Sequence, residues 1–168
     1  MTTTENIILN QVQIDQKIKR IAYQIYETNA SEKEVIVAGI IGNGFVLAEK
    51  IVAVLEEIST LKVTTCKITI NKKKPLEAIT TSLSVGDYKH KSLVVVDDVL
   101  NSGTTLIYAV KHFLEVPLKR FKTAVLVNRN HKKYPVKADF KGISLSTSIK
   151  EHVQVEFSEK GALAYLVE

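Results

Sequence analysis

Two adjacent carboxylates and the small polar residues after them are the part of this sequence best suited to chemistry. Asp97 and Asp98 are followed, after three residues, by Ser102-Gly103-Thr104-Thr105. Hydroxyl groups and free backbone N–H groups in such a stretch attract an oxyanion, and glycine lets the backbone come close to it. A phosphate cannot lie against two carboxylates. We therefore expect the carboxylates to face something else, such as ribose hydroxyls or a metal ion.

The neighbouring residues predict the elements that hold this stretch. Leu93 to Val96 form a continuous apolar run, which is typical of a strand buried on both faces of a parallel sheet. After a predicted loop at Val99–Gly103, an amphipathic helix is expected to begin at Thr104, with its apolar residues at Leu106, Ile107, Val110, Phe113 and Leu114. Strand, acidic pair, loop and helix start outline a site for a sugar phosphate. The alternative is an ordinary loop with one aspartate as a helix cap, which needs neither a carboxylate pair nor the polar run.

The rest of the chain alternates between helical and strand patterns. We predict helices at Asp15–Thr28 and Phe45–Ile58, and further strands at Val35–Ile40, Leu61–Ile70, Phe121–Val127, Val153–Phe157 and Leu163–Val167. Thr2–Gln13 is read as a short strand or arm, Asn71–Lys91 as irregular, and Asn128–Ser148 as mostly loop. This order predicts an α/β fold: a single domain over residues 1–168 with an open, mostly parallel central sheet flanked by helices. The loops Ile41–Gly44, Asp97–Thr105 and Asn128–Asp139 should then share one rim, where such sheets bind ligands.

Composition limits the class of protein. The chain has 168 residues, of which 45% are apolar and 24% charged, as in globular proteins. It has no apolar run long enough to cross a bilayer and no recognisable secretory signal, so a cytoplasmic location is expected. Its single cysteine, Cys66, fits a reducing compartment. The net charge of +5 favours anionic partners, either phosphates or nucleic acid.

The central stretch, VVVDDVLNSGTT, resembles the motif with which type I phosphoribosyltransferases bind 5-phosphoribosyl 1-pyrophosphate (PRPP). The segments Ala124–His131 and Tyr134–Gly142 are similar to a narrower family, the bifunctional pyrimidine-operon attenuation regulators and uracil phosphoribosyltransferases. The similarity runs from about residue 10 onward.

The resemblance assigns roles to specific residues. It implies that Asp97 and Asp98 are the catalytic carboxylates that hold the ribose hydroxyls, and that Mg²⁺ accompanies PRPP. The residues that bind the rest of PRPP would be Val99, Leu100, Asn101, Ser102, Gly103, Thr104 and Thr105, with the last five around its 5′-phosphate. The pyrophosphate loop would be Ile41, Gly42, Asn43 and Gly44, and the base-binding residues Val127, Asn128 and Arg129.

Two segments depart from the family pattern. The pyrophosphate loop of the family reads Gly-Ile-Lys/Arg-Thr-Arg-Gly, whereas residues 39–44 read Gly-Ile-Ile-Gly-Asn-Gly and lack both basic positions. A later acidic pair of the family is replaced here by lysines, within Lys72–Lys74. These differences predict that PRPP or a nucleoside monophosphate binds and that turnover is slow. The lysine run could replace the missing positive charge over the pyrophosphate, or it could simply be a solvated surface loop.

Three functions fit the sequence. The first is an enzyme that transfers the phosphoribosyl group of PRPP to a nucleobase, with uracil expected, and that forms a homodimer or a higher homo-oligomer. The second is a weakly catalytic or non-catalytic, nucleotide-sensing and RNA-binding regulator of pyrimidine genes, with RNA contacts at Arg129, His131, Lys132 and Lys133. The third is a degenerate paralogue that binds a nucleotide and regulates a protein partner.

Overall fold

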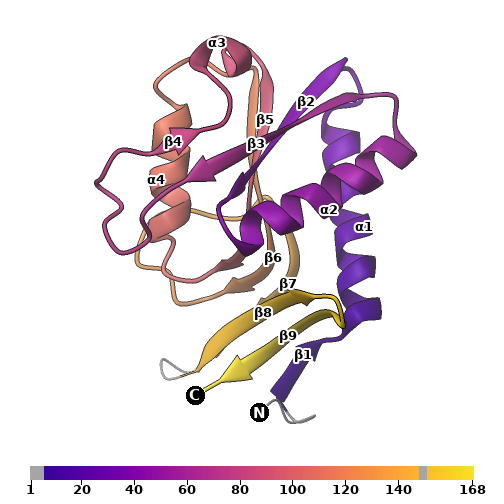
Figure 1. Ribbon diagram of the computed structural model, residues 1–168, viewed down its shortest axis with the longest axis vertical. Coiled ribbons are helices and arrows are strands. Elements are labelled where there is room, and N and C mark those ends of the chain that lie inside the picture. The colour runs from indigo at the N-terminus through magenta and orange to yellow at the C-terminus, as the bar shows by residue number, and fades with distance from the viewer. Residues whose placement is uncertain (1–5, 148–150) are drawn as a thin grey trace.

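A six-stranded sheet forms the centre of the computed structural model, which describes residues 6–147 and 151–168. The strand order is β4–β3–β2–β5–β6–β7 (Figure 1). Five strands run parallel: β2 (Glu34–Ile40), β3 (Lys62–Thr69), β5 (Ser92–Leu100), β6 (Arg120–Arg129) and β7 (Phe140–Leu145). The short edge strand β4 (Thr80–Thr81) is antiparallel to β3. The predicted α/β fold with a mostly parallel sheet is therefore confirmed.

Helices cover both faces of this sheet and account for the apolar run in β5. Helices α1 (Gln11–Thr28) and α2 (Asn43–Ile58) pack on the face that includes Val94 and Val96. Helix α4 (Thr104–Phe113) packs on the opposite face, with Leu93 and Val95, and the short helix α3 (Val85–Tyr88) adds Tyr88 to the same cluster. Successive side chains of β5 thus enter two different cores, as the sequence predicts for a central strand.

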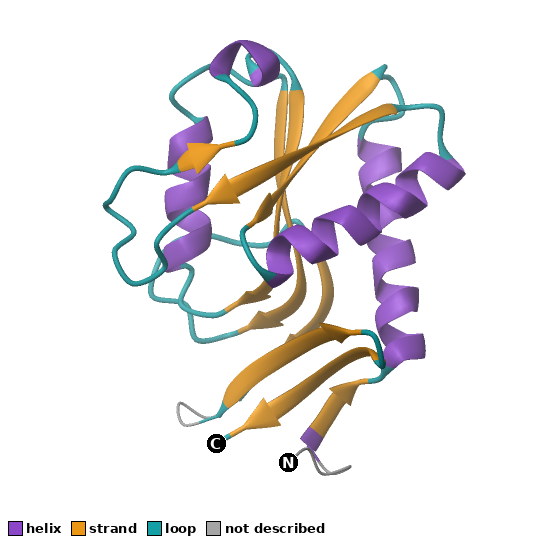
Figure 2. Cartoon of the chain, in the orientation of Figure 1, coloured by secondary structure: helices purple, strands orange, loops and turns teal. Residues whose placement is uncertain are grey.

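A second, smaller sheet stands at the edge of the molecule. It is antiparallel, with the order β1–β9–β8, where β1 is Ile7–Leu9, β8 is His152–Ser158 and β9 is Gly161–Val167. Figure 2 shows this small sheet next to the arrowheads of β6 and β7, so it stands over the carboxyl ends of the parallel strands. Its alternating apolar residues join the core of α1 and α2; they include Leu9, Val153, Val155, Ala162 and Ala164.

Several predicted boundaries need correction. Strand β5 continues through Leu100, so Val99 and Leu100 belong to the strand and not to the following loop. Helix α1 begins four residues earlier than predicted, because Asn10 and Gln13 form a reciprocal capping box with two bonds of 2.9 Å. Helix α2 begins at Asn43, two residues before the predicted start. The part of the predicted N-terminal segment before residue 6 lies outside the described residues.

Strand β7 was predicted to be loop, and that prediction was wrong. Its sequence, FKGISL, mixes buried and exposed residues without clean alternation. Its glycine has a steric role: a Cβ on Gly142 would lie 2.4 Å from the Leu126 carbonyl oxygen of β6. The predicted irregular stretch at 71–91 likewise contains β4 and α3. No helix within residues 6–147 or 151–168 is long and apolar enough to cross a membrane.

Candidate active site at the end of strand β5

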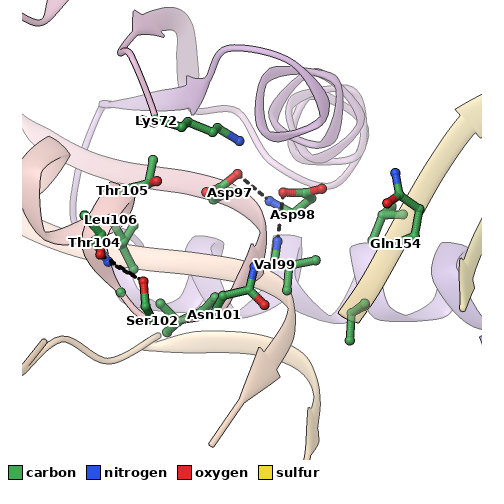
Figure 3. A pocket seen from close by; sticks show the side chains of 14 residues that line it. Lys72, Asp97, Asp98, Val99, Asn101, Ser102, Thr104, Thr105, Leu106 and Gln154 are labelled. Carbon is green, nitrogen blue, oxygen red and sulfur yellow. Dashed lines mark hydrogen bonds between the residues drawn. The ribbon is translucent and has the colours of Figure 1, made fainter. Parts of the chain in front are cut away.

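The two carboxylates lie where β5 reaches the rim of the sheet. Asp97 is buried with 4% of its surface exposed, whereas Asp98 is half-buried. The Asp98 backbone N–H donates a 2.9 Å hydrogen bond to Asp97 Oδ1, and the Val99 N–H donates one of 2.9 Å to Asp98 Oδ1. Each carboxylate is therefore oriented by the backbone N–H of the next residue (Figure 3).

Burial sets the protonation of this pair. Burial raises the pKa of Asp97 well above its ordinary value, because an ionised carboxylate is poorly solvated there. The adjacent charge of Asp98 raises that pKa further, and the positive charge of Lys72 opposes the rise. Helix α2 adds to the enclosure, since a Cβ on Gly44 would lie only 2.9 Å from Asp97 Oδ1. Asp97 is thus a carboxyl group that gains from a positively charged or hydrogen-bond-donating ligand.

The loop after β5 forms a cradle for an anion. Gly103 is the N-cap of α4 and has a φ of 89°, in the left-handed region that glycine adopts without strain. Because Gly103 has no side chain, it does not cap the helix, and the start of α4 can receive a negatively charged group. The hydroxyl oxygens of Ser102 and Thr104 lie 2.9 Å apart at this turn. The Ser102 carbonyl oxygen accepts bonds of 2.7 and 3.1 Å from the Lys133 and Tyr134 N–H groups, which hold the loop in place.

These groups meet in one cavity of about 200 Å³ (Figure 3). The whole run from Asp97 to Thr105 lines it, together with Leu106. The other walls come from Lys72, in the loop after β3, and from Val153, Gln154 and Val155 of β8. The structure therefore brings the predicted acid pair and phosphate-binding residues together, and it encloses them between the central sheet and the small sheet.

Residues 5–160 of the chain match the protein family described as the phosphoribosyl transferase domain. The chain belongs to the phosphoribosyltransferase family. It is 31% identical over 162 residues to a bifunctional protein PyrR of Macrococcus caseolyticus, covering 92% of this chain and 93% of that protein. It is 33% identical over 164 residues to a bifunctional protein PyrR of Corynebacterium glutamicum, covering 90% of this chain and 85% of that protein.

Solved structures share the fold at lower sequence identity. A hypoxanthine-guanine phosphoribosyltransferase from Bacillus anthracis superposes with a TM-score of 0.76 at 19% identity, covering 99% of this chain and 100% of that one. The hypoxanthine phosphoribosyltransferase of Trypanosoma cruzi gives a TM-score of 0.78 at 14% identity and covers 97% of both chains. The phosphoribosyltransferase fold predicted from the sequence is confirmed by these likenesses.

The expected pyrophosphate loop of this phosphoribosyltransferase lies beside the cavity, but none of its four residues is among the described residues that line it. Ile41 is exposed, and its N–H donates a 2.8 Å bond to the Ile68 carbonyl oxygen. Gly42 is the N-cap of α2, with a φ of 92°. Asn43 Nδ2 donates a 2.7 Å bond to the Val155 carbonyl oxygen of β8. The Asn43 side chain therefore holds the small sheet, and within this loop only Gly44 approaches the acid pair.

The three residues expected at the nucleobase lie at the end of β6 and are buried. Asn128 Nδ2 donates a 3.2 Å bond to Ser144 Oγ. The Arg129 guanidinium donates bonds of 3.0 Å to Asn101 Oδ1, 2.7 and 2.9 Å to Thr147 Oγ1, and 2.6 Å to the Glu151 carbonyl oxygen. In this conformation Val127, Asn128 and Arg129 do not line the cavity. Arg129 instead joins the phosphate loop to the segment that leads into the small sheet.

The burial of Arg129 also corrects the expected RNA surface. With 6% of its surface exposed and its guanidinium bonded to Asn101, Thr147 and Glu151, Arg129 is not presented to a partner. His131, Lys132 and Lys133 are exposed on the segment after β6. A ring nitrogen of His131 contacts the Thr147 carbonyl oxygen, and the Lys133 amine lies 5.7 Å from the centre of the Tyr134 ring. Of the four residues expected to contact RNA, His131, Lys132 and Lys133 are therefore the exposed ones.

Sequence reasoning missed the contribution of β8 to the cavity. Val153 to Val155 lie about fifty residues after the acid pair in the chain, and only the topology of the small sheet brings them to it. Lys72 carried a weak signal, because a lysine run fits a solvated loop equally well. The structure places Lys72, but neither Lys73 nor Lys74, among the described residues that line the cavity.

The acid pair also bears on metal binding. Within the described ranges, no group of three or more His, Cys, Asp or Glu side chains could hold a metal by itself. Mg²⁺ is commonly bound by one or two carboxylates together with the phosphates of a substrate. Asp97 and Asp98 fit that arrangement, because both line the cavity beside the phosphate cradle. They suit a Mg²⁺ that arrives with a phosphorylated ligand.

Proposed function

We propose that this protein transfers the phosphoribosyl group of PRPP to a nucleobase, with uracil as the expected base. One observation carries the proposal: a single cavity joins a carboxylate pair to a phosphate cradle at the start of α4. In the reaction, the bond between C1 of the ribose and the pyrophosphate oxygen breaks, and its electron pair leaves with pyrophosphate. A ring nitrogen of the base forms the new bond to C1, and the proton of that nitrogen is released to solvent.

The residues of the chain have separate tasks in this reaction. Asp97 and Asp98 accept hydrogen bonds from the two ribose hydroxyls, and Asn101 to Thr105 hold the 5′-phosphate through backbone N–H groups and hydroxyls. Mg²⁺, when it is bound with PRPP beside the acid pair, supplies positive charge to the pyrophosphate. Positive charge develops on the ribose as pyrophosphate departs, and the nearby carboxylates stabilise it electrostatically. We further propose that residues 1–168 form a single domain, because residues of the small sheet and of the central sheet line the same cavity.

A turnover assay with PRPP, Mg²⁺ and a panel of nucleobases tests the proposal. We expect nucleotide formation with uracil above the other bases, and slow turnover because the loop Ile41–Gly44 supplies no cation. Absence of any nucleotide with every base, from protein that still binds PRPP, would refute the transfer activity and leave a nucleotide-binding role.

A second candidate function is a nucleotide-sensing RNA-binding regulator of pyrimidine genes. The exposed cluster His131–Lys133 favours it, since basic side chains on a rim loop can neutralise RNA phosphates. Each phosphate contact removed should flatten the log–log salt slope of RNA affinity by roughly 0.7–0.9. A triple alanine variant at these positions is compared with Lys19→Ala, which removes an exposed basic side chain on α1. An unchanged salt slope in the triple variant would remove this function in its present form.

We also propose that the protein is cytoplasmic and self-associates as a dimer or a multiple of a dimer. Large apolar side chains on the helical surface support the association: Val12 on α1 is 64% exposed and Leu114, just after α4, is 61% exposed. Light scattering at high micromolar concentration should give at least twice the mass of the 18.7 kDa chain. A mass equal to one chain would contradict the proposal.

A further inference from the structure

Arg129 connects two walls of the cavity, although it is not among the described residues that line it. It lies at the end of β6 with 6% of its surface exposed, and the residue before it pairs with Leu100 at the end of β5. Arg129 is therefore placed beside the start of the phosphate loop. One wall that it reaches contains Asn101 of that loop, and the other contains Val153 of β8.

The guanidinium divides its donors between these two walls. On the loop side, Nη1 donates a 3.0 Å bond to Asn101 Oδ1. On the other side, Nε and Nη2 donate bonds of 2.9 and 2.7 Å to Thr147 Oγ1. Nη2 also donates one of 2.6 Å to the Glu151 carbonyl oxygen, just before β8 begins. Because the guanidinium is planar and its donors are fixed, the bonds to Thr147 and Glu151 set the direction in which Nη1 points.

The bond from Nη1 determines which end of the Asn101 amide can meet a ligand. A guanidinium has donors only, so the amide atom that it contacts must be the oxygen and not the nitrogen. The Asn101 amide nitrogen has no hydrogen-bond partner within residues 6–147 and 151–168. Asn101 is exposed in the cavity wall, and Figure 3 shows it below the acid pair and beside Ser102. The two N–H groups of this amide are thereby left for an acceptor on a bound ligand.

We infer that Arg129 is a positioning residue, which holds the Asn101 amide so that its N–H groups bind an oxygen of the phosphoribosyl group. This inference rests on the proposed function and adds a residue that acts on the same site from behind its wall. An amide that is already oriented loses little conformational freedom when the ligand binds, and affinity rises accordingly. Because the guanidinium is also bonded to Thr147 and Glu151, the orientation of Asn101 depends on the segment that leads into β8.

Variants at both ends of the bond from Nη1 test this role. Arg129→Met removes every guanidinium donor, Arg129→Lys keeps a positive charge but loses the planar fork, and Asn101→Ala removes the amide. Calorimetry measures the affinity of each for ribose 5-phosphate, which carries the phosphoribosyl group without a base or pyrophosphate. We expect affinity to fall about tenfold in Arg129→Met and Asn101→Ala, and at least about threefold in Arg129→Lys. Arg129→Lys carries the test if Arg129→Met does not fold.

A double variant shows whether Arg129 acts through Asn101. With Asn101→Ala already in place, replacing Arg129 should weaken the binding of ribose 5-phosphate no further, because the side chain that it positions is gone. Additive losses would mean that Arg129 affects the ligand by another route, and they would overturn the inference.

Kinetics and a matched control separate positioning from a general loss of structure. Asn101 would bind the phosphoribosyl group equally in the ground state and the transition state, so the KM for PRPP should rise while kcat stays within about twofold. A smaller folded fraction would instead lower kcat and leave KM unchanged. Asn130→Ala is the control: Asn130 Nδ2 donates a 2.9 Å bond to Ser146 Oγ in the same segment, and Asn130 is not among the described residues that line the cavity. It should bind ribose 5-phosphate as the wild type does.

The outcomes distinguish this inference from the proposed function. Unchanged affinity for ribose 5-phosphate in the folded Arg129 variants would overturn the inference, and so would an equal loss in Asn130→Ala. A wild type that turns over PRPP would in either case leave the proposed function standing. A wild type that binds ribose 5-phosphate without turning over PRPP would refute the transfer activity alone, since the affinities of the variants still decide the role of Arg129. A wild type that binds neither ribose 5-phosphate nor a nucleoside monophosphate would overturn both.

Discussion

The two helix starts near the acid pair both begin at a glycine with a positive φ, but the two turns differ in conformation, with ψ of 0° at Gly103 and −139° at Gly42, and in use. Gly103 begins α4 and Gly42 begins α2, with φ values of 89° and 92°, and neither provides a side-chain cap. The turn at Gly103 is surrounded by hydroxyls that line the cavity. In the turn at Gly42, by contrast, the Asn43 amide is already bonded to the small sheet. A glycine at a helix start therefore identifies a possible anion site, and the neighbouring side chains decide whether it is open to a ligand.

The largest expected effect comes from replacing these glycines in parallel. A Cβ on Gly103 would lie 2.6 Å from Val136 Cγ1 at a strained φ, so Gly103→Ala must shift the phosphate loop. A Cβ on Gly42 meets no heavy atom within 4 Å, so Gly42→Ala adds backbone strain of about 1–3 kcal/mol without a steric clash. We expect Gly103→Ala to lose the rise in melting temperature caused by a nucleoside monophosphate, and Gly42→Ala to keep it. If both variants kept it, α4 would not be the phosphate site.

The acid pair should contribute the next largest effect. Asp98→Asn keeps the size of the side chain and removes a charged acceptor for a ribose hydroxyl. Because hydrogen bonds to charged groups are worth about 1.5–3 kcal/mol, binding of PRPP should weaken by about that amount. Isothermal titration calorimetry measures the loss, with Asp87→Asn, a change far from the cavity on α3, as the control. Equal affinities for wild type and Asp98→Asn would remove Asp98 from the ribose site.

Asp97 offers a prediction about stability and pH. Its pKa is raised in the folded protein, so the stability that its protonated form contributes is complete below the ordinary pKa of 3.8 and is lost as pH rises through the raised pKa. Asp97→Asn should therefore unfold at a higher denaturant concentration than the wild type at pH 7, while binding PRPP more weakly. The gain should shrink as the pH approaches 3.8. A variant that is less stable than the wild type at pH 7 would contradict this account of the buried carboxyl.

Parts of this site could be predicted from the sequence alone, and other parts could not. Strand β5, the acid pair and the start of α4 could be predicted because they are consecutive, and local pattern specifies them. Strand β7 could not, because Gly142 and the mixed polarity of its neighbours hide its alternation. The burial of Arg129 and the arrival of Gln154 at the cavity depend on contacts between residues more than twenty positions apart. Such contacts follow from topology, which periodicity does not reveal.

The smallest expected effect concerns the turn at Gly42. Asn43→Ala removes the 2.7 Å bond to the Val155 carbonyl oxygen and leaves that partly buried group without this donor. The free energy of unfolding should fall by about 1 kcal/mol, as for one neutral hydrogen bond. Monophosphate binding should change little, because Asn43 is not among the described residues that line the cavity with the phosphate cradle. Chemical denaturation together with titration checks both parts, and a loss of monophosphate binding larger than the loss of stability would place Asn43 in the site itself.

The melting temperature of the wild type with and without PRPP and Mg²⁺ tests the central claim most directly. A ligand at about a hundred times its dissociation constant stabilises a fold by about 2.7 kcal/mol, which is easily detected as a shift. We predict a clear rise with PRPP, a rise with a nucleoside monophosphate, and no rise with the nucleobase alone. The absence of a shift with PRPP and with every monophosphate would contradict the assignment of a phosphoribosyl site to the cavity between β5, α4 and β8.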